Sequence, residues 1–503
     1  MQYPHYHMGP ARNKLKSASS LRSEMIGLLP CHVQVVRTDK RISFLDALGK
    51  VTVKSLARTV AVALVMASFG CSAILAGEPS AAVFPPAITS ATTPSPDFES
   101  LRVKGLNIAL PGPQDTIDPD FAGIRSSLAA LGIGYIGYTN NNFFYNTLQT
   151  ERTTFGKQAY NGQKPTFFTN NVMQLTYDLS RYGIPDGQIV LGGIYNFDTW
   201  APGGPNALSV ATLSYYQTFL NKLVELKIGY LANAVEFWGP FLAGNLAASI
   251  FGPSATIPVE LGINAWAWAT PAINIKVNGP DGFYNKLGIQ RASNPDGPSV
   301  EKIDNPTNLK WSTPNSGVLV INEFGYRTEA APGQLATWVR AAPMFNNSRY
   351  IDFAFGGRST GNYAGYFLAD QQIIQLAPVT GQAARGVYTG VTAMYAPPEF
   401  NRFSQYYELR LYGIGLLPSR PRDMLSLVVS RNVFSHYLVD AALQQGQLAH
   451  DGSLSITAGY TATIAPGIRV GIGLGYTDHP TPVVYTPQTG SALNILANVI
   501  TFW

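Results

Sequence analysis

The sequence predicts an all-β protein, a closed antiparallel transmembrane β-barrel of about 16 strands of the kind found in bacterial outer membranes. The first observation is that charged residues make up 13% of the 503 residues, whereas soluble proteins carry roughly 25%. The second is a series of strand-like runs, each of roughly ten residues, in which apolar and polar side chains alternate. The third is that long and short connections alternate along the chain. Together these observations favour strands that turn one face to lipid.

Residues 1–76 have the layout of a leader with a secretory signal peptide. Basic residues that end at Arg58 precede an apolar run at 60–70, and small residues follow up to Ala76. We expect cleavage near Ala76 and a mature protein that begins between residues 74 and 82. The unusual length of the leader is explained either by an over-called start codon or by a genuine extended signal.

The leader also accounts for the formal charge of +5. Of the 35 basic and 30 acidic residues it holds ten and three, which leaves 25 and 27 in the rest of the chain. The remainder is therefore slightly acidic and offers no basic surface for nucleic acid.

Residues 77–104 are rich in Pro, Ser, Thr and Ala and are predicted to form a periplasmic linker. The barrel, with a short N-terminal segment, is expected at 105–503. Cys31 and Cys71, the only cysteines, precede the predicted cleavage site, so the mature chain has no disulfide and no thiolate metal site. Past the leader no stretch of about 18 apolar residues occurs, so any crossing of a membrane must use strands.

The strand series rests on strict alternation. In SLSITAGYTATI, residues 453–464, every second side chain from Leu454 is apolar and the others are Ser, Thr or Gly. In GIRVGIGLGY, residues 467–476, apolar side chains alternate with Arg469 and glycines. We assign the apolar faces to lipid and the opposite faces to the lumen. By this pattern the strands are centred near residues 135, 173, 192, 214, 227, 263, 286, 321, 339, 368, 391, 409, 427, 458, 472 and 498.

The connections between these runs also differ systematically in length. This alternation is typical of the extracellular loops and periplasmic turns of an outer-membrane barrel, and a two-sheet sandwich gives no reason for it. The predicted long connections are 479–491, 433–452, 344–361, 292–316 and 233–256. The predicted short ones are 465–467, 416–422, 328–334 and 220–222, and 374–385 and 270–281 are of medium length.

The chain ends with SALNILANVITFW, an alternating run that closes on Phe502 and Trp503. A C-terminal aromatic residue on the last strand resembles the recognition signal of the barrel-assembly machinery. We therefore expect this machinery, together with outer-membrane lipid, among the partners of the protein.

Charged residues fall mainly on the faces assigned to the lumen, because a basic residue in the middle of the lipid layer costs roughly 2–4 kcal/mol. Their alternative role is to brace the wall as ion pairs between strands. Trp266, Trp268 and Trp338 are expected either to stack on sugars or to anchor the barrel in the membrane interface. The residues predicted from alternation to line the pore are Glu225, Lys227, Glu260, Lys286, Glu323, Arg327, Arg340, Glu408, Arg410 and Arg469.

Six segments resemble one known protein family: DPDFAGIRSSLAALGIGY (118–135), GVLVINEFGYR (317–327), APGQLATW (331–338), GYFLADQQI (365–373), RGVYTGVTAMYAPPEFN (385–401) and YGIGLLPSRPRD (412–423). They are similar to segments of the carbohydrate-selective porins of the OprB type, and the resemblance extends over about residues 105–503. The pattern departs from the family at Ala331, where leucine is expected, and near the start, where a tryptophan-glycine pair is missing.

The resemblance implies an outer-membrane channel for the diffusion of monosaccharides and similar small neutral polyols, without cofactor or catalysis. It also implies that Glu323, Asp370, Gln371 and Arg385 occupy motif positions. Asp370 thereby joins the predicted pore-lining residues, although its face of the strand also carries the bulky Tyr366.

Other classes of function are less consistent with the sequence. An enzyme in a barrel needs an activated nucleophile and usually a histidine base, yet no motif surrounds the three histidines beyond the leader, His436, His450 and His479. A structural barrel or adhesin that does not conduct remains the main alternative, and membrane fractionation distinguishes either from a soluble lectin.

Overall fold

The computed structural model describes residues 98–107, 109–148, 158–200, 204–205, 208–238, 256–264, 268–377, 384–485 and 490–503. The predicted leader, most of the predicted linker and Trp266 lie outside the described residues. Within the described ranges, no helix has both the length and the apolar character needed to cross a membrane.

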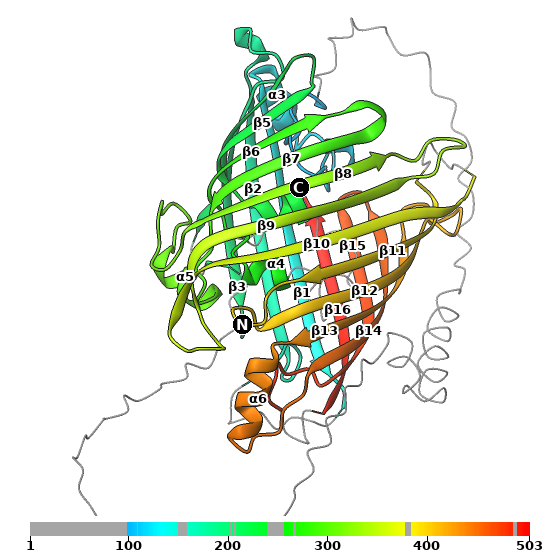
Figure 1. Ribbon diagram of the computed structural model, residues 1–503. Helices are drawn as coiled ribbons and strands as arrows, with labels where there is room; N and C mark the ends of the chain where they lie inside the picture. Colours follow the sequence, from blue (N-terminus) through cyan, green and yellow to red (C-terminus); the bar gives the residue numbers. More distant parts are fainter. Residues whose placement is uncertain are drawn as a thin grey trace, which may run out of the picture. The chain divides into compact units, whose positions relative to one another are not determined.

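The described residues form one closed antiparallel barrel in which every strand pairs with its neighbours in sequence and β1 pairs with β16. The predicted fold class is thereby confirmed (Figure 1). The sixteen strands are β1 (Ile133–Asn146), β2 (Thr166–Asp178), β3 (Gln188–Asp198), β4 (Ser209–Phe219), β5 (Val224–Leu231), β6 (Thr270–Asn278), β7 (Phe283–Arg291), β8 (Val318–Thr328), β9 (Thr337–Ile351), β10 (Arg358–Gln375), β11 (Gly386–Tyr395), β12 (Phe403–Ile414), β13 (Met424–Phe434), β14 (Gly452–Ala465), β15 (Ile468–Asp478) and β16 (Ser491–Phe502).

The two ends of the barrel differ, as the alternating connections predict. The end at which β1 begins and β16 finishes carries mostly short connections and is called the turn end; the opposite end is called the loop end. Helix α3 (Ile124–Ala130) lies at the turn end, and α6 (His436–Gln444) lies at the loop end (Figure 1). The remaining short helices are η1 (Pro113–Asp115), η3 (Ser180–Tyr182), η4 (Ala234–Trp238), α4 (Thr256–Glu260), η7 (Pro280–Gly282) and α5 (Pro298–Asp304).

Fifteen of the sixteen predicted strand centres fall inside an observed strand, and the sixth is wrong. Residues around 263 do not form a strand; α4 ends at Glu260 and β6 begins only at Thr270, in a segment predicted to be a connection. The alternation there was misleading because Leu261 and Ile263 are both fully buried inside the barrel instead of facing lipid. The predicted long loop at 344–361 is also wrong, since β9 and β10 leave only six residues, 352–357, between them.

The outer wall follows the predicted alternation. On β15 the apolar Ile472 is 52% exposed, and on β12 Leu409 is 47% exposed, whereas Glu408 and Arg410 beside it are buried. On β14 the serine and threonine face is buried, as at Ser455 and Thr457. An apolar outer surface over a polar inner one is what a barrel in lipid requires.

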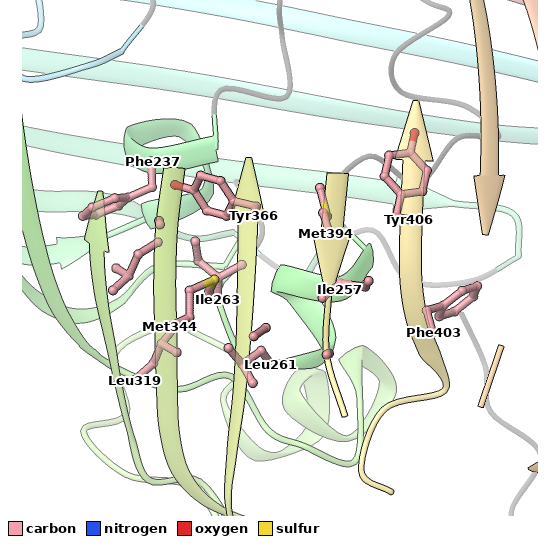
Figure 2. Close-up of a cluster of buried hydrophobic side chains, with 14 of the residues drawn as sticks. Phe237, Ile257, Leu261, Ile263, Leu319, Met344, Tyr366, Met394, Phe403 and Tyr406 are labelled. Carbon is pink, nitrogen blue, oxygen red and sulfur yellow. The ribbon is translucent and has the colours of Figure 1, made fainter. Parts of the chain in front are cut away.

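The long connection between β5 and β6, residues 232–269 and called the inner loop, contributes to a hydrophobic core inside the barrel. Its Phe237, Ile257, Leu261 and Ile263 belong to one buried cluster with residues of strands β8 to β13, including Leu319, Met344, Tyr366, Met394 and Tyr406 (Figure 2). Apolar side chains on these strands therefore face inward as well as outward, which lipid-facing alternation alone does not predict.

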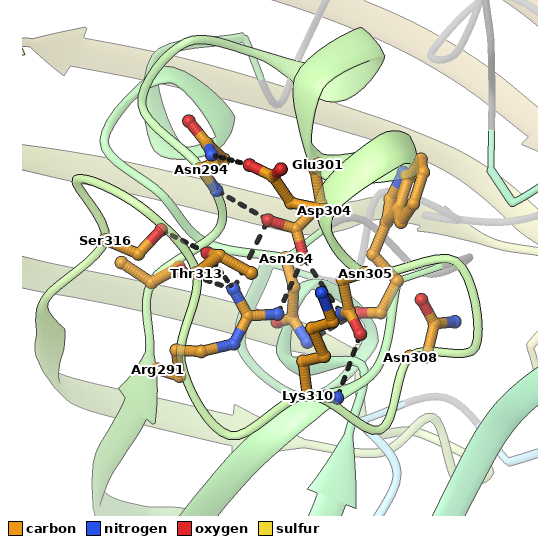
Figure 3. A network of polar contacts seen from close by, with 12 residues as sticks. Asn264, Arg291, Asn294, Glu301, Asp304, Asn305, Asn308, Lys310, Thr313 and Ser316 are labelled. Carbon is orange, nitrogen blue, oxygen red and sulfur yellow. Dashed lines mark hydrogen bonds and ion pairs between the residues drawn. The ribbon is translucent and has the colours of Figure 1, made fainter.

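The connection between β7 and β8 is held by a buried ion pair. The Arg291 guanidinium lies 2.6 Å from the Glu301 carboxylate on α5 and donates a hydrogen bond of 2.9 Å to Thr313 (Figure 3). Glu301 also accepts a hydrogen bond of 2.8 Å from the backbone N–H of Asn294. These contacts close the loop on itself, so that this long connection is ordered beside the loop end.

Candidate functional site

A cavity of about 700 Å³ lies inside the barrel. Strands β1, β2, β4, β5, β15 and β16 border it, and so does the inner loop. The remaining border is formed by described residues of the segment 98–115, called the strap, which precedes the barrel in sequence. The hydrophobic core occupies the side of β8 to β13, and this cavity lies on the other side of the lumen.

The strap reaches from one side of the barrel to the other. Near its start, the carbonyl of Leu101 accepts a hydrogen bond of 2.5 Å from Thr176 on β2. Further along, the carbonyl of Asn107 accepts a hydrogen bond of 2.6 Å from Arg327 on β8. The Asn107 side chain also donates to the carbonyl of Phe237 in the inner loop at 3.0 Å. Because β2 and β8 lie far apart around the barrel, the strap crosses the lumen.

Close backbone approach in the middle of the strap requires a glycine. Gly105 has a φ of +76°, and a Cβ at this position would lie 3.0 Å from the ring of Tyr216 and 3.2 Å from the Lys227 side chain. Only glycine adopts this conformation and this proximity without strain. The contact fits the strap against β4 and β5.

The inner loop is attached to the wall by a buried ionic junction. Lys227 Nζ on β5 lies 2.6 Å from Glu236 Oε1, and Lys286 Nζ on β7 lies 3.5 Å from Oε2 of the same carboxylate. Asn274 on β6 donates a further hydrogen bond of 2.9 Å to Glu236. Burial disfavours the charged form of Glu236, but the two lysines outweigh it and lower the pKa of its carboxyl group. Glu236 and Lys227 both border the cavity.

Arg469 is the second base at the cavity among the predicted residues. It projects inward from β15, half-buried, with its guanidinium carbon 5.4 Å from the centroid of the Phe502 ring. The next three residues on the same face of β15 are Gly471, Gly473 and Gly475, which have no side chain beside it. Of the eleven charged residues predicted to line the pore, Lys227 and Arg469 are the two that border this cavity.

Glu323 lies in the wall beyond the cavity and is completely buried. Its carboxylate accepts hydrogen bonds of 2.9 Å from Tyr284 and 2.5 Å from Tyr366, and Arg340 Nε lies 3.8 Å away. Trp338, also buried, has the guanidinium carbon of Arg340 3.5 Å from its ring centroid. This arrangement matches the wall-bracing role that the sequence left open.

Asp370, Glu408 and Arg410 form a second buried network. Arg410 lies 2.7 Å from Asp370 and 2.5 Å from Glu408, and Tyr406 donates a hydrogen bond of 2.5 Å to Glu408. The ambiguity about Asp370 is resolved, because Tyr366 and Asp370 are both buried and both face inward on β10. The three charges thus tie β10 and β12 together across β11.

The other predicted residues are spread over the barrel. Glu225 pairs with Lys276 at 3.1 Å near the turn end. Arg327 pairs with Glu329 at 2.7 Å besides holding the strap. Glu260 lies on α4, where it accepts a hydrogen bond of 3.1 Å from the Phe403 N–H. Trp268 packs in a small apolar cluster with residues of β2, β3 and β4.

Alternation did not reveal several of the polar residues that border the cavity. Glu236 lies in the inner loop, and Glu99, Arg102 and Asp115 lie in the strap, outside any strand. Alternation predicts which way a side chain points only for residues within a strand. The family motif before the first strand, at 118–135, begins only after these strap residues and gave no signal for them.

The fold and its lumen define the class of protein: a porin-type channel of the outer membrane rather than an enzyme. The family model described as carbohydrate-selective porin, OprB family, matches residues 186–493. The chain belongs to this family, as its resemblance predicted, and is a carbohydrate channel.

A solved porin structure agrees with this fold. The high-pH structure of Pseudomonas putida OprB is 14% identical, has a TM-score of 0.62 and covers 78% of this chain and 99% of its own. The low-pH structure of the same protein gives 12% identity, a TM-score of 0.48 and coverages of 77% and 98%. A variant of the Rh. blastica porin is 9% identical, has a TM-score of 0.41 and covers 74% of this chain and 100% of its own. No curated protein matches the chain.

Proposed function

We propose that the chain is a diffusion channel for monosaccharides and similar small neutral polyols. The observation that carries this proposal is the cavity between strap and wall, where Lys227, Glu236 and Arg469 stand beside neutral groups such as Asn140 and Gln174. A sugar exchanges its hydrogen bonds to water for bonds to such groups at little net cost. Passage is then easy and binding weak, and an ion meets attraction and repulsion on the same path.

Among the residues predicted to line the pore, we propose that Lys227 and Arg469 contact the permeant. Glu323, Arg340, Asp370, Glu408 and Arg410 are better explained as braces of the wall, because each is at least 94% buried and bonded within its own network. We assign Trp338 to the same bracing role.

The C-terminal residues support the further proposal that barrel-assembly machinery recognises the chain. β16 ends at Phe502, whose ring is buried, and Trp503 packs beside Tyr135 with ring centroids 5.8 Å apart. Removal of both residues is expected to lower the yield of folded barrel in the outer membrane without changing synthesis of the chain.

Swelling of liposomes that contain the purified protein tests the transport function. Glucose and other monosaccharides are expected to enter fast, disaccharides slowly, and each rate should scale with the amount of folded barrel. Folding is measured by faster migration in SDS before boiling, because a closed barrel keeps its backbone hydrogen bonds. Folded protein that admits no monosaccharide would contradict the proposal.

One observation favours a second candidate, a barrel that conducts nothing and serves as a structural protein or adhesin. The strap crosses the lumen from β2 to β8. If it closes the channel, planar bilayers will show no conductance steps from folded protein, whereas the sugar channel gives small, regular steps.

A further inference from the structure

The charges around the cavity are unequally paired. Lys227 pairs with Glu236 at 2.6 Å, and Arg102 on the strap pairs with Glu99 at 2.8 Å. Asp115 on the strap pairs with Arg422 from the connection between β12 and β13. Arg469 differs from these bases: among the residues that the structure describes, no acceptor is hydrogen-bonded to its guanidinium.

The charged groups that face Arg469 leave its charge uncompensated. Asp115 is the acid whose field acts on it, and Arg422 is the second base nearby. Two guanidiniums thus share one carboxylate, and this carboxylate is already engaged by Arg422. Among the residues that the structure describes, one positive charge therefore remains beside this carboxylate, in a partly enclosed space where attraction to an anion is stronger than in bulk water.

Neutral hydrogen-bonding groups lie within reach of this guanidinium. The strand register places Arg469 opposite Ile500 on β16, and Ile500 opposite Asn140 on β1. Arg469 and Asn140 are thus two strand spacings apart, about 10 Å between their Cα atoms. The Asn140 carbonyl oxygen accepts hydrogen bonds from Asn498 at 2.6 Å and Asn142 at 3.2 Å, which leaves its NH₂ group for a solute.

We propose that Arg469 makes this cavity a binding site for a sugar acid, with the carboxylate of the solute on the guanidinium and its hydroxyls toward Asn140. A guanidinium presents a planar pair of N–H donors that matches both oxygens of a carboxylate. One uncompensated charge suits a monoanion such as a hexuronate better than a doubly charged sugar phosphate. The inference rests on the proposed function, since the sugar acid must enter the same channel as neutral sugars.

The experiment compares the entry of D-glucuronate and of glucose into liposomes that contain wild-type protein or Arg469→Gln. Loss of one charge-assisted contact is expected to lower the glucuronate-to-glucose flux ratio at least about fivefold. Arg469→Lys keeps the charge but loses the planar donor pair, so its flux ratio should fall between those of the wild type and Arg469→Gln. D-Glucuronate should also shorten the open time of single wild-type channels and not of Arg469→Gln channels.

Arg420→Gln is the matched control. It removes one positive charge from the connection between β12 and β13 at the turn end, outside the cavity lining. Its partner Asp423 stays bonded to the N–H of Thr463 at 2.9 Å and to the Tyr460 hydroxyl, so the variant is expected to fold. The Arg420→Gln flux ratio should equal that of the wild type.

The flux measurements distinguish failure of the channel function from failure of the sugar-acid site. If wild-type liposomes admit neither solute, the proposed channel function fails, and the assignment of Arg469 fails with it. If glucose enters but Arg469→Gln leaves the glucuronate ratio unchanged, the sugar-acid site alone is wrong. It is also wrong if Arg420→Gln lowers the ratio equally, or if glucose 6-phosphate depends on Arg469 more strongly than glucuronate does.

Discussion

Lys227 on β5 and Glu236 in the inner loop form an ion pair of 2.6 Å in which both side chains are almost completely buried. The pair joins a wall strand to a segment that borders the cavity, and Lys286 contributes from β7. Buried charges of this kind stabilise a structure only while all partners are present.

Replacement of Glu236 by Gln is therefore expected to destabilise the barrel by about 3–5 kcal/mol, because it leaves two lysines buried without their carboxylate. The inner loop should loosen, and the variant should show noisier single-channel currents and lose its unboiled gel mobility at a lower temperature. Glu225→Gln is the control: its pair with Lys276 is partly exposed, and its effect should be at most about 1 kcal/mol. Equal stability of the two variants would exclude the anchoring role.

Arg410→Met should lower stability by about 3–5 kcal/mol, because it leaves Asp370 and Glu408 buried without their shared partner. Glucose flux per folded channel should not change, since none of the three residues borders the cavity. The measurement is liposome swelling normalised to folded protein, together with the temperature of the gel-mobility transition. A change in sugar selectivity would return these residues to the permeation path.

Glu323→Gln should have a smaller effect, about 1–3 kcal/mol, because Tyr284 and Tyr366 can still donate hydrogen bonds to the amide oxygen. Ion selectivity and glucose flux of folded channels should match the wild type. Reversal potentials in a salt gradient provide the decisive measurement. A shift toward anions would show that Glu323 acts in the pore despite its burial.

Gly105→Val is expected to displace the strap, since its side chain would meet Tyr216 and Lys227 and its φ of +76° is unfavourable for valine. Single-channel conductance should then rise, because the strap occupies part of the lumen. Gly123→Val is the control with a similar φ of +88° and no atom within 4 Å of the added Cβ. If the two variants conduct alike, the strap does not limit the conductance of the lumen.

His450 predicts a pH dependence at the loop end. Its half-buried ring stacks on His479 with centroids 4.7 Å apart and meets the edges of Phe434 and Tyr485. Burial first, and the neighbouring His479 second, lower the pKa of His450 from 6.5 to about 4, whereas Asp451 acts weakly in the other direction. The folded state therefore favours the neutral ring. The stability that this provides is complete above pH 6.5 and is lost as the pH falls toward 4.

Hydrogen exchange can measure this effect. The amide of His450, bonded to the carbonyl of Val483 at 3.0 Å, should become less protected between pH 6.5 and pH 4 after correction for intrinsic exchange. His450→Phe keeps the aromatic contacts without a titrating group, so its protection should be independent of pH. Identical pH profiles of the two proteins would rule out His450 as the cause.

The sequence by itself determined the barrel. Lipid accepts only apolar side chains, so alternation along β14 or β15 shows which face is outside, and a period of two then fixes the direction of Lys227 and Arg469. The lengths of most connections followed from turn signals that are local in the chain. Fold class, family and the inward direction of most wall charges are therefore properties of the amino-acid pattern alone.

The tertiary structure decided what the inward residues do. Alternation predicts that Glu323 and Arg469 both point inward. Glu323, however, is enclosed by two tyrosines and Arg340, whereas Arg469 faces a cavity. This difference depends on where the inner loop and the strap lie, and neither obeys strand alternation, because their apolar residues bury against the lumen wall instead of facing lipid. Which carboxylate meets which base is set by contacts between segments far apart in sequence, such as Asp115 with Arg422, and a local pattern carries no information about them.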